Sequence, residues 1–271
     1  MPELPEVETT RRGVAPHVIG RRVERVIVRE PRLRWPVSPA LAETLPGRRI
    51  DDVSRRAKYL LFAAGDGHLM LHLGMSGRLR VVPAGLAPES HDHLDIVLDS
   101  GQALRFHDPR RFGSAFWLTG EPETYPLLAG LGPEPLSDAF DGDWLHARSR
   151  GRRAPVKAFL MDSRIVVGVG NIYACEALHM AGIHPARPAG RISRARYTAL
   201  AEAVRAVLAD AIAAGGTTLR DYVGVDGGTG WFQLRLAVYG KAGEPCPRGC
   251  GPVRRRVIGQ RSTFFCPVCQ R

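Results

Sequence analysis

The first half of the chain alternates apolar and polar residues in short segments that glycine, proline and aspartate interrupt. Alternation with a period of two is typical of β-strands that bury one face. After a helix-like opening, the segments that fit this pattern are 25–29, 59–63, 68–82, 93–99 and 103–107. Such a series of short strands predicts a β-sandwich or barrel.

The pattern changes to helical periodicity from residue 154 onward. The clearest helix spans 197–212, where apolar residues recur at intervals of three and four. Ser193 can cap its start, and Gly215-Gly216 can end it. Residues 130–151 are rich in proline, glycine and aspartate and carry no period, so we place the join between the two folds there.

These patterns predict a multidomain α+β fold in three parts. We expect an N-terminal β-sandwich or barrel domain with a leading helix at 1–131, a helical domain at 132–236 and a C-terminal domain at 237–271. Within the last part, residues 241–271 hold seven basic residues against the single Glu244. They hold too few apolar side chains to fold unaided, so a bound metal is expected to stabilise them.

Composition narrows the choice of partner. The 271 residues include 38 Lys and Arg against 27 Asp and Glu, a net charge of +11, and the pI is about 10.1. This surplus favours an extended polyanion such as nucleic acid, although anionic membranes and ribosomal RNA attract basic proteins too. The longest uncharged apolar run, Tyr59–Gly65, is far too short to span a membrane. No secretory signal pattern opens the chain, so we expect a cytoplasmic protein.

Four of the five cysteines crowd into the last 26 residues as a C-x3-C-x15-C-x2-C array. They are Cys246, Cys250, Cys266 and Cys269. Their spacing is near that of four-cysteine zinc ribbons, in which two turns each supply a pair of thiolates to one tetrahedral ion. The alternative is that these cysteines are unrelated free thiols, but their clustering would then be an accident. Protein would fill all four positions, so we expect one structural Zn²⁺ and no chemistry at the metal.

The residues between the two cysteine pairs are strongly basic. They include Arg254, Arg255, Arg256 and Arg261. A hairpin tip that carries these guanidinium groups would present a cationic surface to phosphate. The fifth cysteine, Cys175, falls in a helical stretch and is expected to be a small buried apolar residue.

The chain opens with Met-Pro-Glu-Leu-Pro-Glu. Removal of Met1 would leave Pro2 with a free secondary amine, of which roughly a tenth is neutral and nucleophilic at pH 7. Its attack on a sugar C1′ would give a cationic iminium, and Glu3 and Glu6 could protonate the ring oxygen and hold the amine in place. The same residues are equally a plain helix start, with proline and acidic residues in the first turn.

Six segments share the motifs of one family, in that family's order. They read MPELPEVETTRRG, RRAKYLL, HLGMSG, HDPRRFG, VVGVGNIYACEAL and GQRSTFFCPVCQ. On these motifs the whole chain resembles formamidopyrimidine-DNA glycosylase. The opening is similar to the oxidised-purine branch and unlike the endonuclease VIII branch, which usually has glycine at the third position of that motif. The resemblance implies a β-sandwich with an N-terminal helix, a helix-two-turn-helix domain and a zinc-finger hairpin.

The chemistry that the resemblance implies is base-excision repair by a bifunctional DNA glycosylase and AP lyase. Pro2 would attack C1′ of an oxidised purine nucleotide, either 8-oxoguanine or a formamidopyrimidine, and Glu3 would be the general acid and base. Lys58 would protonate the ribose or the departing phosphate, and Arg261 would assist the second, δ elimination. Without the resemblance, Lys58 would be interpreted as a solvated lysine at the start of a strand.

The resemblance also implies how duplex DNA is held while a damaged base is extracted. Extrusion costs a few kcal/mol and leaves a gap that inserted side chains fill. Met75, Arg110 and Phe112 would fill it, with Arg110 facing the orphaned base, preferably cytosine. Glycines flank the Met75 turn and a proline precedes Arg110, so both segments are predicted loop tips. Core packing is the other interpretation of Met75 and Phe112.

The resemblance implies that the residues touching the DNA backbone are His91, Arg152, Lys157 and Asn171. Gly168 and Gly170 precede a helix expected near Ile172, whose free N–H groups suit a phosphate. Without a third glycine and a strand-helix-strand unit they do not make a dinucleotide fold, so no nucleotide cofactor is expected. The expected partner is duplex DNA with an oxidised purine, bound by a monomer under a lid at 216–239.

Two other functions fit parts of this pattern. One is a zinc-ribbon protein that binds or senses damaged DNA without catalysis, but the presence of Pro2, Glu3 and Lys58 favours the enzyme. The other is the pyrimidine-preferring relative, which the opening motif and the Met-Arg-Phe set disfavour. Borohydride trapping of a covalent adduct on an 8-oxoguanine duplex separates all three.

Overall fold

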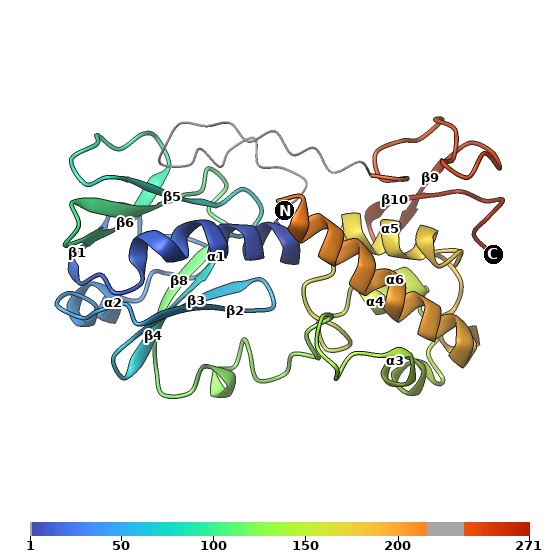
Figure 1. The fold of residues 1–271 in the computed structure, drawn as a ribbon, viewed down its shortest axis with the longest axis horizontal. Coiled ribbons are helices and arrows are strands. Elements are labelled where there is room, and N and C mark those ends of the chain that lie inside the picture. The colour runs from blue at the N-terminus through green and yellow to red at the C-terminus, as the bar shows by residue number, and fades with distance from the viewer. Residues whose placement is uncertain (1, 216–235) are drawn as a thin grey trace. The chain divides into compact units, whose positions relative to one another are not determined.

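The computed structural model describes residues 2–215 and 236–271. They form two compact units, one built from 2–129 and the other from 130–214 and 236–271 (Figure 1). The first unit is rich in strands and the second in helices, which confirms the predicted α+β class. In the described part of the chain, no helix has both the length and the apolar character that crossing a membrane requires.

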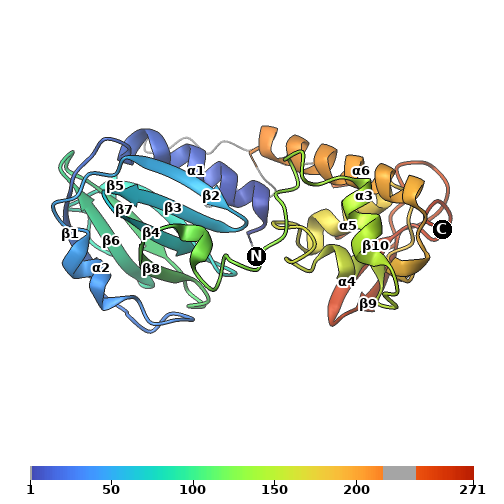
Figure 2. The same ribbon diagram turned by 90° about the horizontal axis from the view of Figure 1, so that it is seen from below.

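Two antiparallel four-stranded sheets form a sandwich in the first unit (Figure 2). One sheet has the order β1-β6-β7-β5, with β1 Val23–Val28, β6 Asp92–Leu98, β7 Gln102–His107 and β5 Arg78–Pro83. The other has the order β2-β3-β4-β8, with β2 Asp52–Arg56, β3 Tyr59–Ala64, β4 Gly67–His72 and β8 Ser114–Thr119. Apolar side chains from both sheets share one core, so the predicted sandwich is confirmed.

Two helices cover the edges of this sandwich. Helix α1 (Leu4–Val18) packs against β2 and β5, an edge strand of each sheet, and α2 (Pro39–Thr44) packs against the other two edge strands, β1 and β8. A bare strand edge exposes unpaired backbone groups, so both helices protect the sheets. Glu8 of α1 also binds Arg55 of β2 at 3.3 Å, which fixes α1 along that edge. A short 3-10 helix, η1 (Pro122–Thr124), follows the last strand.

The segment 68–82, expected as one strand, is two strands in different sheets. Between β4 and β5 the chain turns sharply: Gly74 has a φ of +65°, and the N–H of Gly77 donates to the carbonyl of Leu73 at 2.8 Å. A side chain on Gly77 would lie 2.2 Å from that carbonyl oxygen, so only glycine fits there. The turn carries the chain from one sheet to the other and places Met75 on the surface.

Helices dominate the second unit and bury a core of their own. They are α3 (Gly142–Ser149), α4 (Val156–Leu160), α5 (Asn171–Met180), the 3-10 helix η2 (Ala189–Arg191) and α6 (Arg194–Ala213). The helix predicted over 197–212 is confirmed as α6, with Ser193 as its N-cap residue and Gly215 in a left-handed conformation after its end. An antiparallel hairpin of β9 (Arg254–Ile258) and β10 (Arg261–Phe265) packs against α5.

Helix α3 lies inside the region 130–151, which the sequence pattern assigned to an irregular join. Asp141 caps it by accepting from the N–H of Trp144 at 2.7 Å. The guanidinium of Arg148 stacks over the Trp144 ring at 4.2 Å. The helix has eight residues, and its few apolar positions carry too weak a period to reveal it from sequence.

Candidate active site and metal centre

Pro2 and Glu3, the residues predicted to begin the chemistry, stand at the start of α1. Glu3 is the N-cap residue, and its N–H donates to the carboxylate of Glu6 at 2.8 Å as one half of a capping box. Both carboxylates are buried, whereas Pro2 is half-buried. The helix-start interpretation is therefore confirmed. The catalytic interpretation is compatible with it, because the cap fixes the backbone of Glu3 directly beside Pro2, and it stays a prediction.

Lys58 lies in the two-residue turn between β2 and β3 and not at the start of a strand. Helix α1 packs against both strands, and both views place this turn and the first turn of α1 at the same end of the sandwich (Figures 1 and 2). His72, at the end of β4, packs its ring against Tyr59 at 4.8 Å. Burial, with the charges of Lys58 and Arg34, lowers the pKa of His72 to about 4, so this histidine is neutral at pH 7.

Met75 and Phe112 lie on neighbouring surface loops, and each is 40% exposed. The core-packing interpretation of these two residues is therefore wrong. The guanidinium of Arg110 lies over the Phe112 ring at 4.9 Å, and a Cβ on Gly74 would lie 2.3 Å from the Phe112 carbonyl carbon. Two exposed apolar side chains beside a cation can fill a gap in a base stack. His91 is exposed just before β6 in the same unit.

Lys157 and Asn171 lie together in the second unit, where they join α4 and α5 to β10. The Lys157 ammonium donates to Asn171 Oδ1 at 2.5 Å and to Thr263 Oγ1 at 2.7 Å. The Asn171 amide donates to the carbonyl of Ser262 at 3.0 Å. Lys157 is 1% exposed, so it braces the hairpin in this structure, and its contact with a DNA phosphate stays a prediction.

Arg152 differs from Lys157 because its guanidinium lies at the surface, between α3 and α4. Its Nε donates to the carbonyl of Arg148 at 3.0 Å, which leaves the outer face of the side chain toward solvent. Arg261, at the start of β10, and the three arginines of β9 are exposed as well. The hairpin thus presents the basic surface that the sequence predicts.

Glu176 of α5 is a positioning residue that sequence reasoning missed. Its buried carboxylate accepts from the backbone N–H groups of Ala237, Val238 and Tyr239 at 2.6, 3.0 and 2.8 Å. These contacts anchor the segment that leads into the C-terminal hairpin. Nothing local in the sequence signals them, because the partners are backbone groups 61 to 63 residues away. Of the lid predicted at 216–239, residues 216–235 lie outside the described part of the chain.

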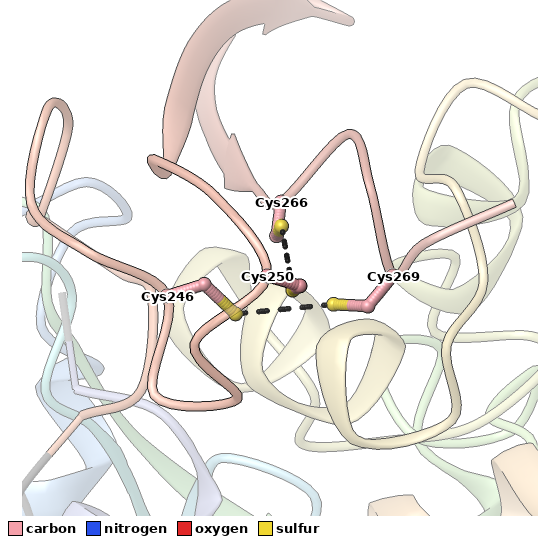
Figure 3. Close-up of side chains that lie close together, drawn as sticks. All are labelled: Cys246, Cys250, Cys266 and Cys269. Carbon is pink, nitrogen blue, oxygen red and sulfur yellow. Dashed lines mark hydrogen bonds between the residues drawn. The ribbon is translucent and has the colours of Figure 1, made fainter.

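The sulfur atoms of Cys246, Cys250, Cys266 and Cys269 converge from two turns (Figure 3). Cys246 Sγ lies 3.9 Å from Cys269 Sγ, Cys250 Sγ lies 3.4 Å from Cys266 Sγ, and all four atoms fall within 4.8 Å of one another. A tetrahedral ion with Zn–S bonds of about 2.3 Å requires sulfur atoms about 3.8 Å apart. These four side chains can therefore hold a metal ion.

Backbone groups adapt the two turns to this role. Burial raises the pKa of the Cys266 thiol, but the N–H groups of Cys269 and Val268 bring it down to about 7, whereas burial and the neighbouring thiols raise the pKa values of Cys250 and Cys269. Gly249 and Gly251 have φ values of +69° and +152°. Both values lie in the region that favours glycine, so these two residues give the turn around Cys250 its backbone freedom.

Two side chains that sequence reasoning missed hold the cysteine turns on α5 and the loop after it. His179 Nε2 lies 3.3 Å from Cys246 Sγ. Gln270 accepts from the N–H of Cys266 at 2.8 Å and donates to the carbonyl of Ile183 at 2.9 Å. Polar side chains packed around metal ligands orient them, so His179 and Gln270 can hold the cysteines in place.

Comparison with known proteins agrees with this geometry. Residues 1–115 match the model of the formamidopyrimidine-DNA glycosylase N-terminal domain, and residues 131–223 match that of the formamidopyrimidine-DNA glycosylase H2TH domain. The chain is 60% identical to the formamidopyrimidine-DNA glycosylase of Stenotrophomonas maltophilia (strain K279a) and 62% identical to that of Alkalilimnicola ehrlichii, with all of each chain covered.

Solved structures give the same result. The MutM (Fpg) protein from Thermus thermophilus superposes with a TM-score of 0.87 at 45% identity, over 99% of this chain and 98% of that one. Lactococcus lactis Fpg, in complex with DNA that contains an abasic site, superposes with a TM-score of 0.91 at 34% identity, over 99% of each chain. Family models, full-length relatives and solved folds agree, and the chain belongs to the formamidopyrimidine-DNA glycosylase family.

Proposed function

We propose that this chain is a bifunctional DNA glycosylase and AP lyase that removes oxidised purines from duplex DNA, with cytosine preferred opposite the lesion. The observation that carries the proposal is the start of α1, where the capping box holds the buried Glu3 directly beside Pro2. Lys58 lies in a turn at the same end of the sandwich. A nucleophile, an acid and a cation are thus available to one substrate.

The proposed reaction begins with the Pro2 amine, which forms a bond to C1′ while Glu3 protonates the ring oxygen of the sugar. The bond from C1′ to the base breaks, and the base leaves with the electron pair and takes up the amine proton. The bond from C1′ to the protonated ring oxygen then opens, so that an iminium joins Pro2 to the open sugar. This cation acidifies the C2′ proton. The Glu3 carboxylate, which has given its own proton to the ring oxygen, would accept it, and the electron pair left at C2′ expels the 3′ phosphate in β elimination. Lys58 would protonate the ribose or the departing phosphate, and Arg261 would assist δ elimination of the second phosphate.

The remaining assignments belong to the same proposal. Met75, Arg110 and Phe112 fill the gap left by the extruded base, and His91, Arg152, Lys157 and Asn171 contact the DNA backbone. One structural Zn²⁺ is held by the four clustered cysteines. We further propose that the domains divide at 1–131, 132–236 and 237–271, and that the protein acts as a monomer in the cytoplasm.

We predict that Glu3→Gln lowers base release from an 8-oxoguanine duplex about 100-fold or more, because it removes the proton donor. Binding to that duplex is expected to stay unchanged. Borohydride should trap wild-type protein on the 8-oxoguanine duplex, whereas Glu3→Gln should be trapped only on an abasic duplex, whose sugar already offers an aldehyde. Glu24→Gln, an exposed carboxylate of β1 changed in the same way, is the control. Normal excision by Glu3→Gln would show that another group is the acid, and a wild-type protein that leaves no adduct would exclude the lyase.

We predict that DNA affinity falls steeply with salt and that Arg152→Gln makes this dependence shallower. Each phosphate neutralised contributes about 0.9 to the slope of log affinity against log salt, so the slope should fall by about one. Affinity should drop equally for damaged and undamaged duplexes, since a backbone contact carries no sequence information. Arg164→Gln, whose guanidinium is ion-paired with Asp162 at 2.9 Å, removes the same charge and should leave the slope unchanged. A loss confined to lesion duplexes would contradict the positioning role.

A further inference from the structure

The two loops that carry Met75, Arg110 and Phe112 meet at one buried carboxylate, that of Asp108. Asp108 is wholly buried at the end of β7. Its Oδ1 accepts from the Ser76 hydroxyl at 2.7 Å, and its Oδ2 accepts from the N–H of Gly113 at 2.8 Å. Ser76 follows Met75, and Gly113 follows Phe112. The Asp108 carboxylate therefore accepts a hydrogen bond from the residue that follows each of the two exposed apolar side chains.

Ser76 extends this connection to the third residue of the set. Its hydroxyl donates to Asp108 and accepts from the backbone N–H of Arg110 at 3.3 Å. A single hydroxyl thus links the Met75 turn to the loop of Arg110 and Phe112 in two ways. Because the Asp108 oxygens are removed from water, these bonds hold more firmly than the same contacts at the surface.

Backbone contacts around Asp108 fix the carboxylate itself. Its N–H donates to the carbonyl of His91 at 3.0 Å, and its own carbonyl is hydrogen-bonded to His93 Nε2 at 2.8 Å. A side chain on Gly113 would lie 3.1 Å from Oδ2 and 2.7 Å from the carbonyl oxygen of His72, so the loop is seated against β4 as closely as a glycine permits. Asp108 has little room to move independently of either loop.

We propose that Asp108, acting through Ser76, is the positioning residue that holds Met75, Arg110 and Phe112 as one preorganised insertion element. The inference rests on the proposed function of these three side chains in filling the gap beside an extruded base. A wedge that is rigid before binding loses less conformational freedom when it enters the stack, so more of its contact energy is available to unstack the base. Asp108 itself touches neither the DNA nor the reacting atoms.

Ser76→Ala tests the proposal because it removes the link between the loops and leaves the bond from Gly113 to Asp108 in place. We expect base release from an 8-oxoguanine duplex to fall about tenfold or more, the equivalent of one lost hydrogen bond to a charged group. The preference for cytosine over adenine opposite the lesion should narrow, because Arg110 loses its fixed place. Ser76→Thr keeps a hydroxyl and should restore both properties.

A second substrate separates this role from a general defect. Cleavage of an abasic site in a single-stranded oligonucleotide needs no extrusion and offers no opposite base, so Ser76→Ala should cleave it at the wild-type rate. Equal losses on both substrates, or no loss on the duplex, would overturn the proposal. A wild-type protein that cleaves neither substrate would instead refute the proposed lyase function, so the two failures are distinguishable.

Discussion

Adding one residue before Pro2 is expected to abolish both base release and strand nicking. The extension turns the secondary amine into an amide, whose nitrogen has no nucleophilic lone pair, so no bond to C1′ forms and no iminium can follow. Pro2 is half-buried at the start of α1, and Glu3 and Glu6 stay in place behind it. Nicking and borohydride trapping on an 8-oxoguanine duplex measure the effect, and binding to that duplex should persist.

The matched control restores the amine in the same protein. A chain expressed with Met-Ala before Pro2 loses its methionine and retains the alanine, which an aminopeptidase specific for a residue preceding proline then removes. Nicking and trapping should return together as Pro2 is freed. An extended protein that nicks at the wild-type rate before this treatment would show that the nucleophile is another group.

Removing the metal is expected to disorder the C-terminal hairpin and abolish DNA binding. In zinc-finger peptides, a four-ligand zinc site contributes about 10–16 kcal/mol of apparent binding energy that is also folding energy. Most of β9 is exposed, so apart from the contacts of β10 with α5 the hairpin depends on the metal centre for its stability. Metal analysis should find one zinc per chain. Removal of the zinc by a chelator should weaken the circular dichroism signal and lower the affinity for duplex DNA. Cys250→Ser should behave like the chelated protein because it removes one ligand.

Cys175→Ala is the control, since this buried cysteine packs against Val238, Val253 and Phe264 and is not among the four clustered thiols. It should keep its zinc and its affinity for DNA. Finding no zinc in the purified protein would overturn the metal assignment. A Cys250→Ser protein with normal metal content and activity would show that Cys250 does not supply a ligand.

The sequence alone predicted the strands wrongly where the alternation of apolar and polar residues continues across a turn. Residues 68–82 kept the alternation of a strand, yet the chain leaves one sheet and enters the other between Leu73 and Gly77. Helix α3 was hidden for the opposite reason, since eight residues hold too few apolar positions for a period to register. Both errors concern local geometry that the apolar pattern does not encode.

Three residues are exposed or buried contrary to what their residue type predicts. Met75 and Phe112 are apolar and would ordinarily enter a core, yet both are exposed because their loops project from the strand ends. Lys157 is charged and would ordinarily be solvated, yet it is buried because Asn171 and Thr263 accept from its ammonium. Neither outcome follows from the type of residue, since each depends on partners supplied from elsewhere in the chain.

What the sequence by itself determined is local. The cysteine spacing predicted the metal centre, because each pair of ligands falls within one turn, and the opening residues predicted the amine and its neighbouring acid, because they are adjacent in the chain. Only the tertiary structure decided which distant groups meet: Ser76 with Asp108, 32 residues apart, and Lys157 with Thr263, 106 residues apart. Contacts between residues so far apart in the sequence form only when the two sheets and the two cores fold, because only folding of the whole chain brings such residues together.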